Sequence, residues 1–401
     1  MNVLCITYGL PYPPHSGARA RDFFLLREIA KQHRVTCACL LEQPDEARQI
    51  AALETFGIRA IGIPPADTTI FQKARAFAQH RAVRRPLATF DFWNTRLYEC
   101  VQELTTGESY DIVQIEHSFL VPYLDALPKS FRGKTILDLH NIGGRQYARL
   151  AALPLSLSAR AQFWLKARLM QNWEAQHAAR FDRVLTVSEK EAAWLRAENP
   201  ALRVSVVENG VDTRAIPFLA QSENRAKLLF VGTLGYAPNA DGLQWFGAEI
   251  LPQIQRTIPE VSLQIVGRAT NARMRAFSDL PNVSLAANVS GLESFYRDAE
   301  VVVVPLRAGG GTRLKILEAM AYGRAIVSTH LGAEGLDVRD GEDLLLADTP
   351  RAFAARVIEL LQNRAERERI AYNARQLAET RWAWSHLGTK LLSIYDELAA
   401  V

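Results

Sequence analysis

Short apolar runs alternate with longer amphipathic stretches along the first half of the chain. Residues 2–9 form an apolar run that ends near Gly and Pro, which is typical of a strand buried on both faces. The next stretch carries Phe23 and Ile29 on one helical face, and Ser16 is in position to cap its start. Another buried strand is predicted at 35–41. Strand, helix and strand in this order form the unit of a parallel sheet.

The same rhythm continues to about residue 205 and then starts again. Further strands are predicted in the first part at 58–63, 112–115, 136–139 and 184–187. After a more polar stretch at 213–227, strands are predicted at 228–231, 262–266, 283–285, 301–304, 325–329 and 344–346. We therefore predict an α/β protein of two Rossmann-like domains, 1–207 and 208–381, with 382–401 as a closing helix that returns to the first domain.

The composition excludes several classes of protein. Of 401 residues, 48% are hydrophobic and 22% are charged, with a formal net charge of +4, which excludes a disordered chain and does not predict nucleic-acid binding. No apolar run reaches the roughly 18 residues of a membrane-spanning helix, and no signal-peptide pattern is present. The four cysteines match neither a disulfide framework nor a zinc site. We therefore expect a cytoplasmic protein.

The most informative segment is a glycine-rich turn between an apolar run and a helical pattern that ends at Gly323. Glycine lets the backbone approach a ligand closely, and the first N–H groups of a helix are unsatisfied donors at its positive end. The turn and the helix start contain Gly309, Gly310, Gly311, Thr312, Arg313 and Lys315. The segment therefore predicts an anion site to which the two basic side chains add charge.

Glu318 lies one helical turn beyond Lys315, where its carboxylate could accept hydrogen bonds from a pair of sugar hydroxyls. This order favours a sugar linked to a diphosphate. The alternative is a flexible turn followed by an ordinary i,i+3 ion pair between Lys315 and Glu318. The segment is not a Walker A motif, and the first strand is not followed by GxGxxG, which argues against an ATPase and an NAD(P) dehydrogenase.

The glycine-rich segment resembles the C-terminal signature of the family 4 glycosyltransferases, in the version GxGTRxKxLEAMAxGxPxV. Other stretches resemble motifs of that family in the expected order: Pro11 to Gly17, Asp138-Leu-His140-Asn141, Asp182 to Glu189, Asn209-Gly-Val-Asp212 and the closing aromatic helix from Trp382 to Tyr395. The resemblance covers essentially the whole chain. It implies a GT-B fold, in which an N-terminal acceptor domain and a C-terminal nucleotide-sugar domain face each other across a deep cleft.

The resemblance also implies an activity. A sugar would move from a nucleotide-diphosphate sugar, with retention of configuration and without a metal or other cofactor, to a glycan or lipid-linked acceptor in cell-surface polysaccharide or glycolipid synthesis. His140 would lie near the reacting centre and act with Arg313 and Lys315. The donor-binding positions would be Gly17, Gly232, Thr233, Gly267, Arg268, Val289, Gly309, Gly310, Gly311, Thr312 and Glu318. Purely structural roles for Gly17 and His140 are the alternatives.

One departure from the family concerns charge at the donor site. Family members commonly carry two glutamates separated by seven residues, and here the second is Glu318 whereas the first position is Gly310. The Gly-Arg and nearby lysine that neutralise the diphosphate in many members correspond here to Gly232-Thr233, with no lysine before Gly242. We therefore predict that Arg313 and Lys315 supply the positive charge instead.

Two stretches of the first domain, 71–90 and 143–173, contain basic and aromatic residues but no acidic ones. Such a combination suits the surface of an anionic membrane, where each cation contributes about 1 kcal/mol. We expect the first domain to contact the inner face of the cytoplasmic membrane; a solvated helix face over core aromatics is the alternative. Two other functions stay open, a sugar-nucleotide epimerase of the same fold and a non-catalytic sugar-nucleotide-binding protein.

Overall fold

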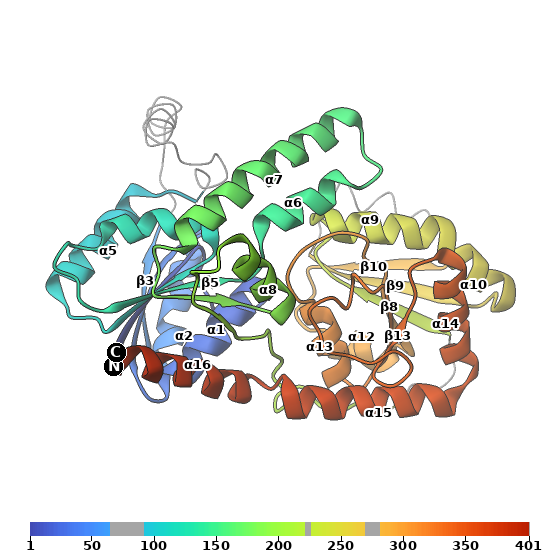
Figure 1. The fold of residues 1–401 in the computed structure, drawn as a ribbon. Coiled ribbons are helices and arrows are strands. Elements are labelled where there is room, and N and C mark those ends of the chain that lie inside the picture. Colours follow the sequence, from blue (N-terminus) through green and yellow to red (C-terminus); the bar gives the residue numbers. More distant parts are fainter. Residues whose placement is uncertain (65–91, 221–225, 269–280, 401) are drawn as a thin grey trace. The chain divides into compact units, whose positions relative to one another are not determined.

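The computed structural model describes residues 1–64, 92–220, 226–268 and 281–400, and the chain forms two compact units (Figure 1). Unit 1 comprises Met1–Ala151, Leu155–Asn209 and Trp384–Val401, and unit 2 comprises Ala152–Pro154 and Gly210–Ala383. The units therefore change at 209 and 383, where the sequence predicted 207 and 381. The second shift arises because Trp382 is buried in unit 2, where its carbonyl accepts a hydrogen bond of 2.8 Å from the Val211 N–H. The basic stretch 71–90 lies outside the described residues.

Unit 1 is built, within its described residues, on a seven-stranded parallel sheet with the order β3-β2-β1-β4-β5-β6-β7. The strands are β1 (Asn2–Thr7), β2 (Arg34–Leu40), β3 (Ile58–Ile63), β4 (Ile112–Glu116), β5 (Lys134–Leu139), β6 (Arg183–Thr186) and β7 (Val204–Val206). Most form apolar runs that are buried on both faces, as parallel strands between helices must be. The sequence did not predict β7, because its three residues are too few for a periodic signal.

The helices of unit 1 connect these strands and cover the sheet. They are α1 (Gly17–Ala30), η1 (Pro44–Gln49), α2 (Ile50–Glu54), α5 (Thr95–Gly107), η2 (Ser118–Ala126), α6 (Gly143–Ala151), α7 (Leu157–Ala178), α8 (Glu189–Glu198) and α16 (Trp384–Ala399). Ser16 caps α1, as predicted, by accepting a hydrogen bond from the Arg19 N–H. The last helix, α16, packs against α1: Trp384 stacks on Phe24, with ring centroids 5.3 Å apart.

Unit 2 contains a six-stranded parallel sheet, counted in its described residues, with the order β10-β9-β8-β11-β12-β13. The strands are β8 (Lys227–Val231), β9 (Ser262–Gly267), β10 (Val283–Ala287), β11 (Val301–Val304), β12 (Ala325–Ser328) and β13 (Leu345–Leu346). The helices are α9 (Ala237–Trp245), η3 (Phe246–Ile250), α10 (Leu251–Thr257), α12 (Glu293–Asp298), α13 (Leu314–Ala321), α14 (Pro350–Gln362) and α15 (Arg364–Arg381). Strand β11 is completely buried and anchors the loop that leads to α13.

The strand order reverses at one point in each sheet, between β1 and β4 in unit 1 and between β8 and β11 in unit 2. In open parallel sheets, ligands bind beyond the carboxyl ends of the strands at such a point, because the connections diverge there. Gly17 follows β1, and the glycine-rich turn follows β11. The fold therefore brings Gly17 and the glycine-rich turn, both predicted to bind the donor, to the carboxyl edges of their sheets.

Candidate functional site

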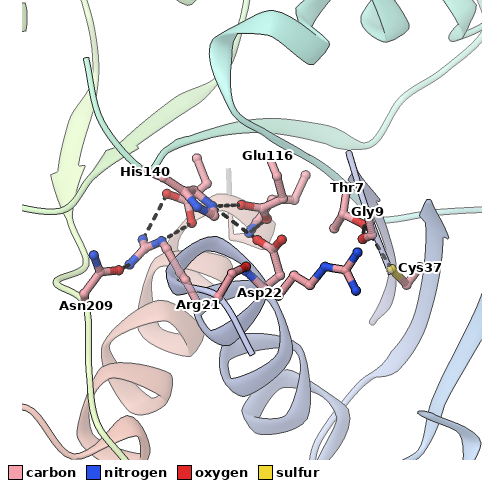
Figure 2. Close-up of polar contacts among 12 residues, drawn as sticks. Thr7, Gly9, Arg21, Asp22, Cys37, Glu116, His140 and Asn209 are labelled. Carbon is pink, nitrogen blue, oxygen red and sulfur yellow. Dashed lines mark hydrogen bonds and ion pairs between the residues drawn. The ribbon is translucent and has the colours of Figure 1, made fainter. Parts of the chain in front are cut away.

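The carboxyl edge of the sheet in unit 1 carries a cluster of buried ionisable side chains (Figure 2). Glu116 ends β4, His140 directly follows β5, and Asp22 lies in α1. The imidazole Nε2 of His140 lies 2.8 Å from Glu116 Oε2 and 3.2 Å from Asp22 Oδ1. None of the three residues is more than 7% exposed. His140 is therefore held between two carboxylates at the edge where ligands bind in this class of fold.

The two carboxylates favour the charged form of the ring. Burial raises the pKa of Glu116 to about 7. Burial by itself would lower the pKa of His140, but Asp22 and Glu116 outweigh it and raise that pKa to about 10. His140 is thus an imidazolium at neutral pH. Its Nδ1 is buried and has no hydrogen-bond partner among the described residues, so that an N–H donor is left for a ligand.

Arg21 lies next to this cluster, but its guanidinium is engaged by other groups. Nε and Nη2 donate to the carboxylate of Asp138 at 3.0 and 2.9 Å. Nη1 donates to the Glu208 carbonyl at 3.0 Å and to Asn209 Oδ1 at 3.1 Å. This buried arrangement connects α1 to β5 and to the segment after β7 (Figure 2). Asp138 and Asn209 therefore hold the framework around His140.

Three residues of this edge, Asp22, Glu116 and His117, were not predicted from the sequence. His117 adopts φ 68° and ψ 146°, a conformation that costs a residue other than glycine about 1–3 kcal/mol. Its ring centroid lies 3.8 Å from that of His140, and burial lowers its pKa. Glu116 and His117 could have been found as polar residues at a strand end, by the argument used for His140. Asp22 gave no signal, because an acid within a helix is usually a surface residue.

The side chains of Asp22, Glu116 and His140 also include atoms of the kind that bind divalent cations, and these atoms lie within 4.8 Å of one another. A metal would have to displace the imidazole Nε2 from its contacts with both carboxylates. We therefore interpret the three residues as an ion-pair cluster.

Gly17 is the first residue of α1, and the first turn of this helix contains no acidic residue. The backbone N–H groups of this first turn therefore lie at the positive end of a helix of 14 residues. This position is compatible with the predicted contact to an anionic ligand.

In unit 2, the side chain of Lys315 reaches from α13 to the carboxyl end of β8. Its Nζ donates to Asn239 Oδ1 at 2.8 Å and lies 4.2 Å from the ring centroid of Phe230. A Cβ atom added to Gly232 would come within 2.7 Å of this Nζ, so a side chain there would displace the lysine. Lys315 therefore places its amine beside the Gly232-Thr233 loop, where the family pattern would have its arginine and lysine.

The glycine-rich turn wraps around the side chain of Arg313. Its Nη1 donates to the carbonyls of Gly310 and, at 2.6 Å, of Gly311. Gly309 and Gly311 have φ values of 116° and 68°, which L side chains rarely adopt. The guanidinium thus holds the loop through its carbonyls, and its predicted role in neutralising the diphosphate stays a prediction.

The alternative of a simple ion pair on α13 does not match the geometry. Among the described residues, no contact within 4.0 Å links Lys315 to Glu318. Burial lowers the pKa of Lys315 to about 7 and raises that of Glu318 to about 7. Each group therefore sits in a weakly solvated environment and can change its protonation when a charged ligand arrives.

Of the other predicted donor-binding residues of unit 2, Gly267 and Arg268 lie at the Gly232-Thr233 loop, whereas Val289 and Thr312 lie elsewhere in the unit. Gly267 lies directly against the Gly232-Thr233 loop, since an added Cβ would be 2.1 Å from the Gly232 carbonyl oxygen. The carbonyl of Arg268 accepts a hydrogen bond of 2.8 Å from Leu234, and its side chain is exposed. These residues share one edge with Thr233 and Lys315. Val289 is half-buried against the core after β10, and Thr312 is buried within the turn.

Family models match both halves of the chain. A model described as Glycosyltransferase Family 4 matches residues 23–215, and a model described as Glycosyl transferases group 1 matches residues 225–363. Together they cover most of both units.

Individual proteins agree with this result. An uncharacterized 44.6 kDa protein in the cps region of Klebsiella pneumoniae is 24% identical over 68% of this chain and 71% of its own length. A phosphatidyl-myo-inositol mannosyltransferase of Mycobacterium tuberculosis is 28% identical over 54% of this chain, which spans 59% of that protein.

Solved structures share the whole fold. Sucrose-phosphate synthase from Thermosynechococcus elongatus has a TM-score of 0.76 at 17% identity and aligns over 100% of this chain and 99% of its own. The HepE protein of Anabaena, in complex with UDP and glucose, has a TM-score of 0.67 at 14% identity over 98% and 99% of the two chains.

Proposed function

Because the chain belongs to the group 1 and family 4 glycosyltransferases of GT-B fold, we propose that it transfers a sugar from a nucleotide-diphosphate sugar to a glycan or lipid-linked acceptor, with retention of configuration. The reaction would serve cell-surface polysaccharide or glycolipid synthesis. The observation that carries the donor half of this proposal is the anion site of unit 2. There, a glycine-rich turn, a helix start and the enclosed amine of Lys315 converge on the carboxyl end of β8.

A diphosphate suits this site for electrostatic reasons. The first N–H groups of α13 lack helical acceptors and carry partial positive charge. Lys315 adds a full charge whenever a ligand anion raises its pKa from about 7. Arg313 keeps the glycine backbone in its positive-φ conformation, so that the cradle exists before the ligand arrives.

Transfer breaks the bond between the anomeric carbon and the diphosphate oxygen and forms a bond from that carbon to the acceptor oxygen. The acceptor's proton passes to the leaving phosphate oxygen on the same face, so the protein supplies no obligatory base. Negative charge grows on the diphosphate in this step, and Lys315 and the α13 start stabilise it. The Nδ1–H of His140, which has no partner among the described residues, is a donor that a ligand oxygen can use. No step requires a metal.

The relatives support the proposed acceptor. One is encoded in a cps region, and another is named as a mannosyltransferase of phosphatidyl-myo-inositol. The four cysteines of this chain, Cys5, Cys37, Cys39 and Cys100, are all free.

The proposal is tested by incubating the protein with UDP-, GDP- and ADP-sugars, with and without lipid-linked glycan acceptors, and measuring release of the nucleoside diphosphate. Acceptor-dependent release supports transfer. Isomerised donor without release indicates the epimerase alternative, and donor binding without any turnover indicates a non-catalytic binding protein. NMR of the product's anomeric proton tests retention, and an inverted product contradicts it.

The role of the anion site is tested by donor-dependent thermal shifts. Because a ligand that binds only the folded state raises the melting temperature, Lys315→Ala is expected to reduce the shift produced by each donor. Arg256→Ala, which removes an exposed basic side chain from α10, is the matched control. Equal shifts in wild type and Lys315→Ala would exclude Lys315 from donor binding.

A further inference from the structure

Exposed large apolar side chains are concentrated on one helix of unit 1. Of the seven such residues in the described part of the chain, five lie between residues 155 and 169, in α7 or just before it. Leu157 is 80% exposed, Trp164 58% and Leu165 54%. Single exposed apolar residues are ordinary, but a cluster of this kind marks an interaction surface.

This surface is not the side of α7 that packs in the protein. The packed side carries Ala167, Met170 and Trp173, all buried. It also carries Glu174, whose carboxylate accepts hydrogen bonds from the first N–H groups of α6 at 2.9 and 3.1 Å. The position of α7 in unit 1 is therefore secured without the exposed residues.

The exposed residues form a second apolar side of the same helix. Counted from Leu157, Trp164, Leu165 and Leu169 lie seven, eight and twelve residues further along, so the four residues fall within an arc of about 140° around the helix. A helix of a soluble protein normally presents one apolar side only. We call these four residues the α7 apolar face.

Cations accompany the α7 apolar face. Arg160, Lys166 and Arg168 are exposed, and none of them forms an ion pair with an acidic group among the residues that the structure describes. Arg168 lies beside Trp164, with its Cζ 5.6 Å from the ring centroid. The stretch 143–173 contains no acidic residue. The surface therefore combines an interfacial tryptophan, leucines and uncompensated positive charge.

We propose that the α7 apolar face docks on an anionic lipid bilayer, with Trp164 and Leu165 at the headgroup level and the three cations among the lipid phosphates. An anionic bilayer matches both the apolar side chains and the cations, because its hydrocarbon interior lies beneath a negatively charged surface. None of the described helices is long and apolar enough to cross a membrane. This inference rests on the proposed function, because docking would bring the acceptor-binding unit to lipid-linked acceptors.

The test is flotation of the full chain with vesicles of mixed phosphatidylglycerol and phosphatidylcholine, and with vesicles of phosphatidylcholine alone. We expect flotation with the anionic vesicles and its weakening as salt is raised. Replacing the three cations together, as Arg160→Gln, Lys166→Gln and Arg168→Gln, is expected to lower the partition coefficient about a hundredfold. The matched control replaces three exposed cations elsewhere, as Lys129→Gln, Arg203→Gln and Arg256→Gln.

The apolar contribution is tested by Trp164→Ser with Leu165→Ser, against the control Tyr372→Ser, which removes a side chain that is 57% exposed on α15. We expect only the α7 pair to lose flotation. Failure of the wild-type chain to float with anionic vesicles, or equal flotation of the α7 variants, overturns the proposal. So does concentration-dependent self-association that the α7 pair abolishes, because a second copy then covers the face. No sugar donor is present, so the result is independent of the transfer activity.

Discussion

Replacing Glu116 by glutamine should convert His140 from a group that is protonated throughout the neutral range into one that titrates near neutral pH. The pKa of His140 is about 10 because Asp22 and Glu116 face its Nε2 from α1 and β4, with Asp138 further away on β5. An opposite charge at such a distance contributes about 1–3 pKa units. Glu116→Gln keeps the shape of the side chain but removes one charge, so the pKa should fall to roughly 7–9.

The wild-type protein and Glu116→Gln should therefore respond differently to rising pH. In the wild-type protein, His140 stays protonated as pH rises through the neutral range, and its Nδ1–H remains a donor. In Glu116→Gln, the ring loses its proton between pH of about 7 and 9, and with it the charge that we assign to donor binding. A loss of 1–3 pKa units corresponds to about 1.4–4 kcal/mol of lost preference for the charged ring.

The assay is 15N NMR of the imidazole groups across pH, with His140 assigned by comparison with His140→Gln, together with the pH profile of nucleoside-diphosphate release. Glu174→Gln is the matched control, because Glu174 is also a buried carboxylate of unit 1 but binds the start of α6. A wild-type His140 that titrates near 6.5, or an unchanged titration in Glu116→Gln, would refute the assignment. The NMR measurement does so without relying on activity.

Three further predictions concern other parts of the two units. Arg313→Ala should weaken donor affinity through loss of order in the glycine turn; unchanged affinity in both Arg313→Ala and Lys315→Ala, measured by calorimetry, would contradict the anion site. Donor affinity of the wild type should fall as pH rises above about 7, where Lys315 loses its proton, and this dependence should vanish in Lys315→Ala. Gly388→Ala should destabilise unit 1 by about 1–3 kcal/mol in urea unfolding, because its Cβ would lie 2.4 Å from that of Glu28; an unchanged unfolding midpoint would show that α1 and α16 can separate freely.

The sequence was most informative where the predicted function depends on the local conformation of the backbone. The turn at 309–311 was predicted from glycines alone, and two of the three have the positive φ that only glycine accepts readily. The start of α1 after Ser16 and the burial of β11 were equally local features. The pattern could therefore predict both loops and the sheets that carry them.

Residues that act through distant partners were harder to predict. Glu116, His140 and Asp22 meet only because three separate elements end or pass at one edge, and nothing near Asp22 in the sequence announces this. The direction of the Arg313 side chain, towards its own loop, depends on the turn's three-dimensional path. The boundary between the two units at 383 depends on where Trp382 packs. No local sequence pattern predicts that packing.

The docking of α16 on α1 has a consequence for biosynthesis. Unit 2 is almost one continuous stretch, Gly210–Ala383, but unit 1 takes its last helix from residues that follow that stretch. Tyr395 of α16 donates to Gln114 Oε1 at 2.7 Å in the interior of unit 1. At about 5–20 residues per second, a ribosome needs roughly 10–35 s to make the intervening residues. During that interval unit 1 exposes the apolar side of α1, so nascent chains should engage chaperones while unit 2 is being made and be released only after α16 is made.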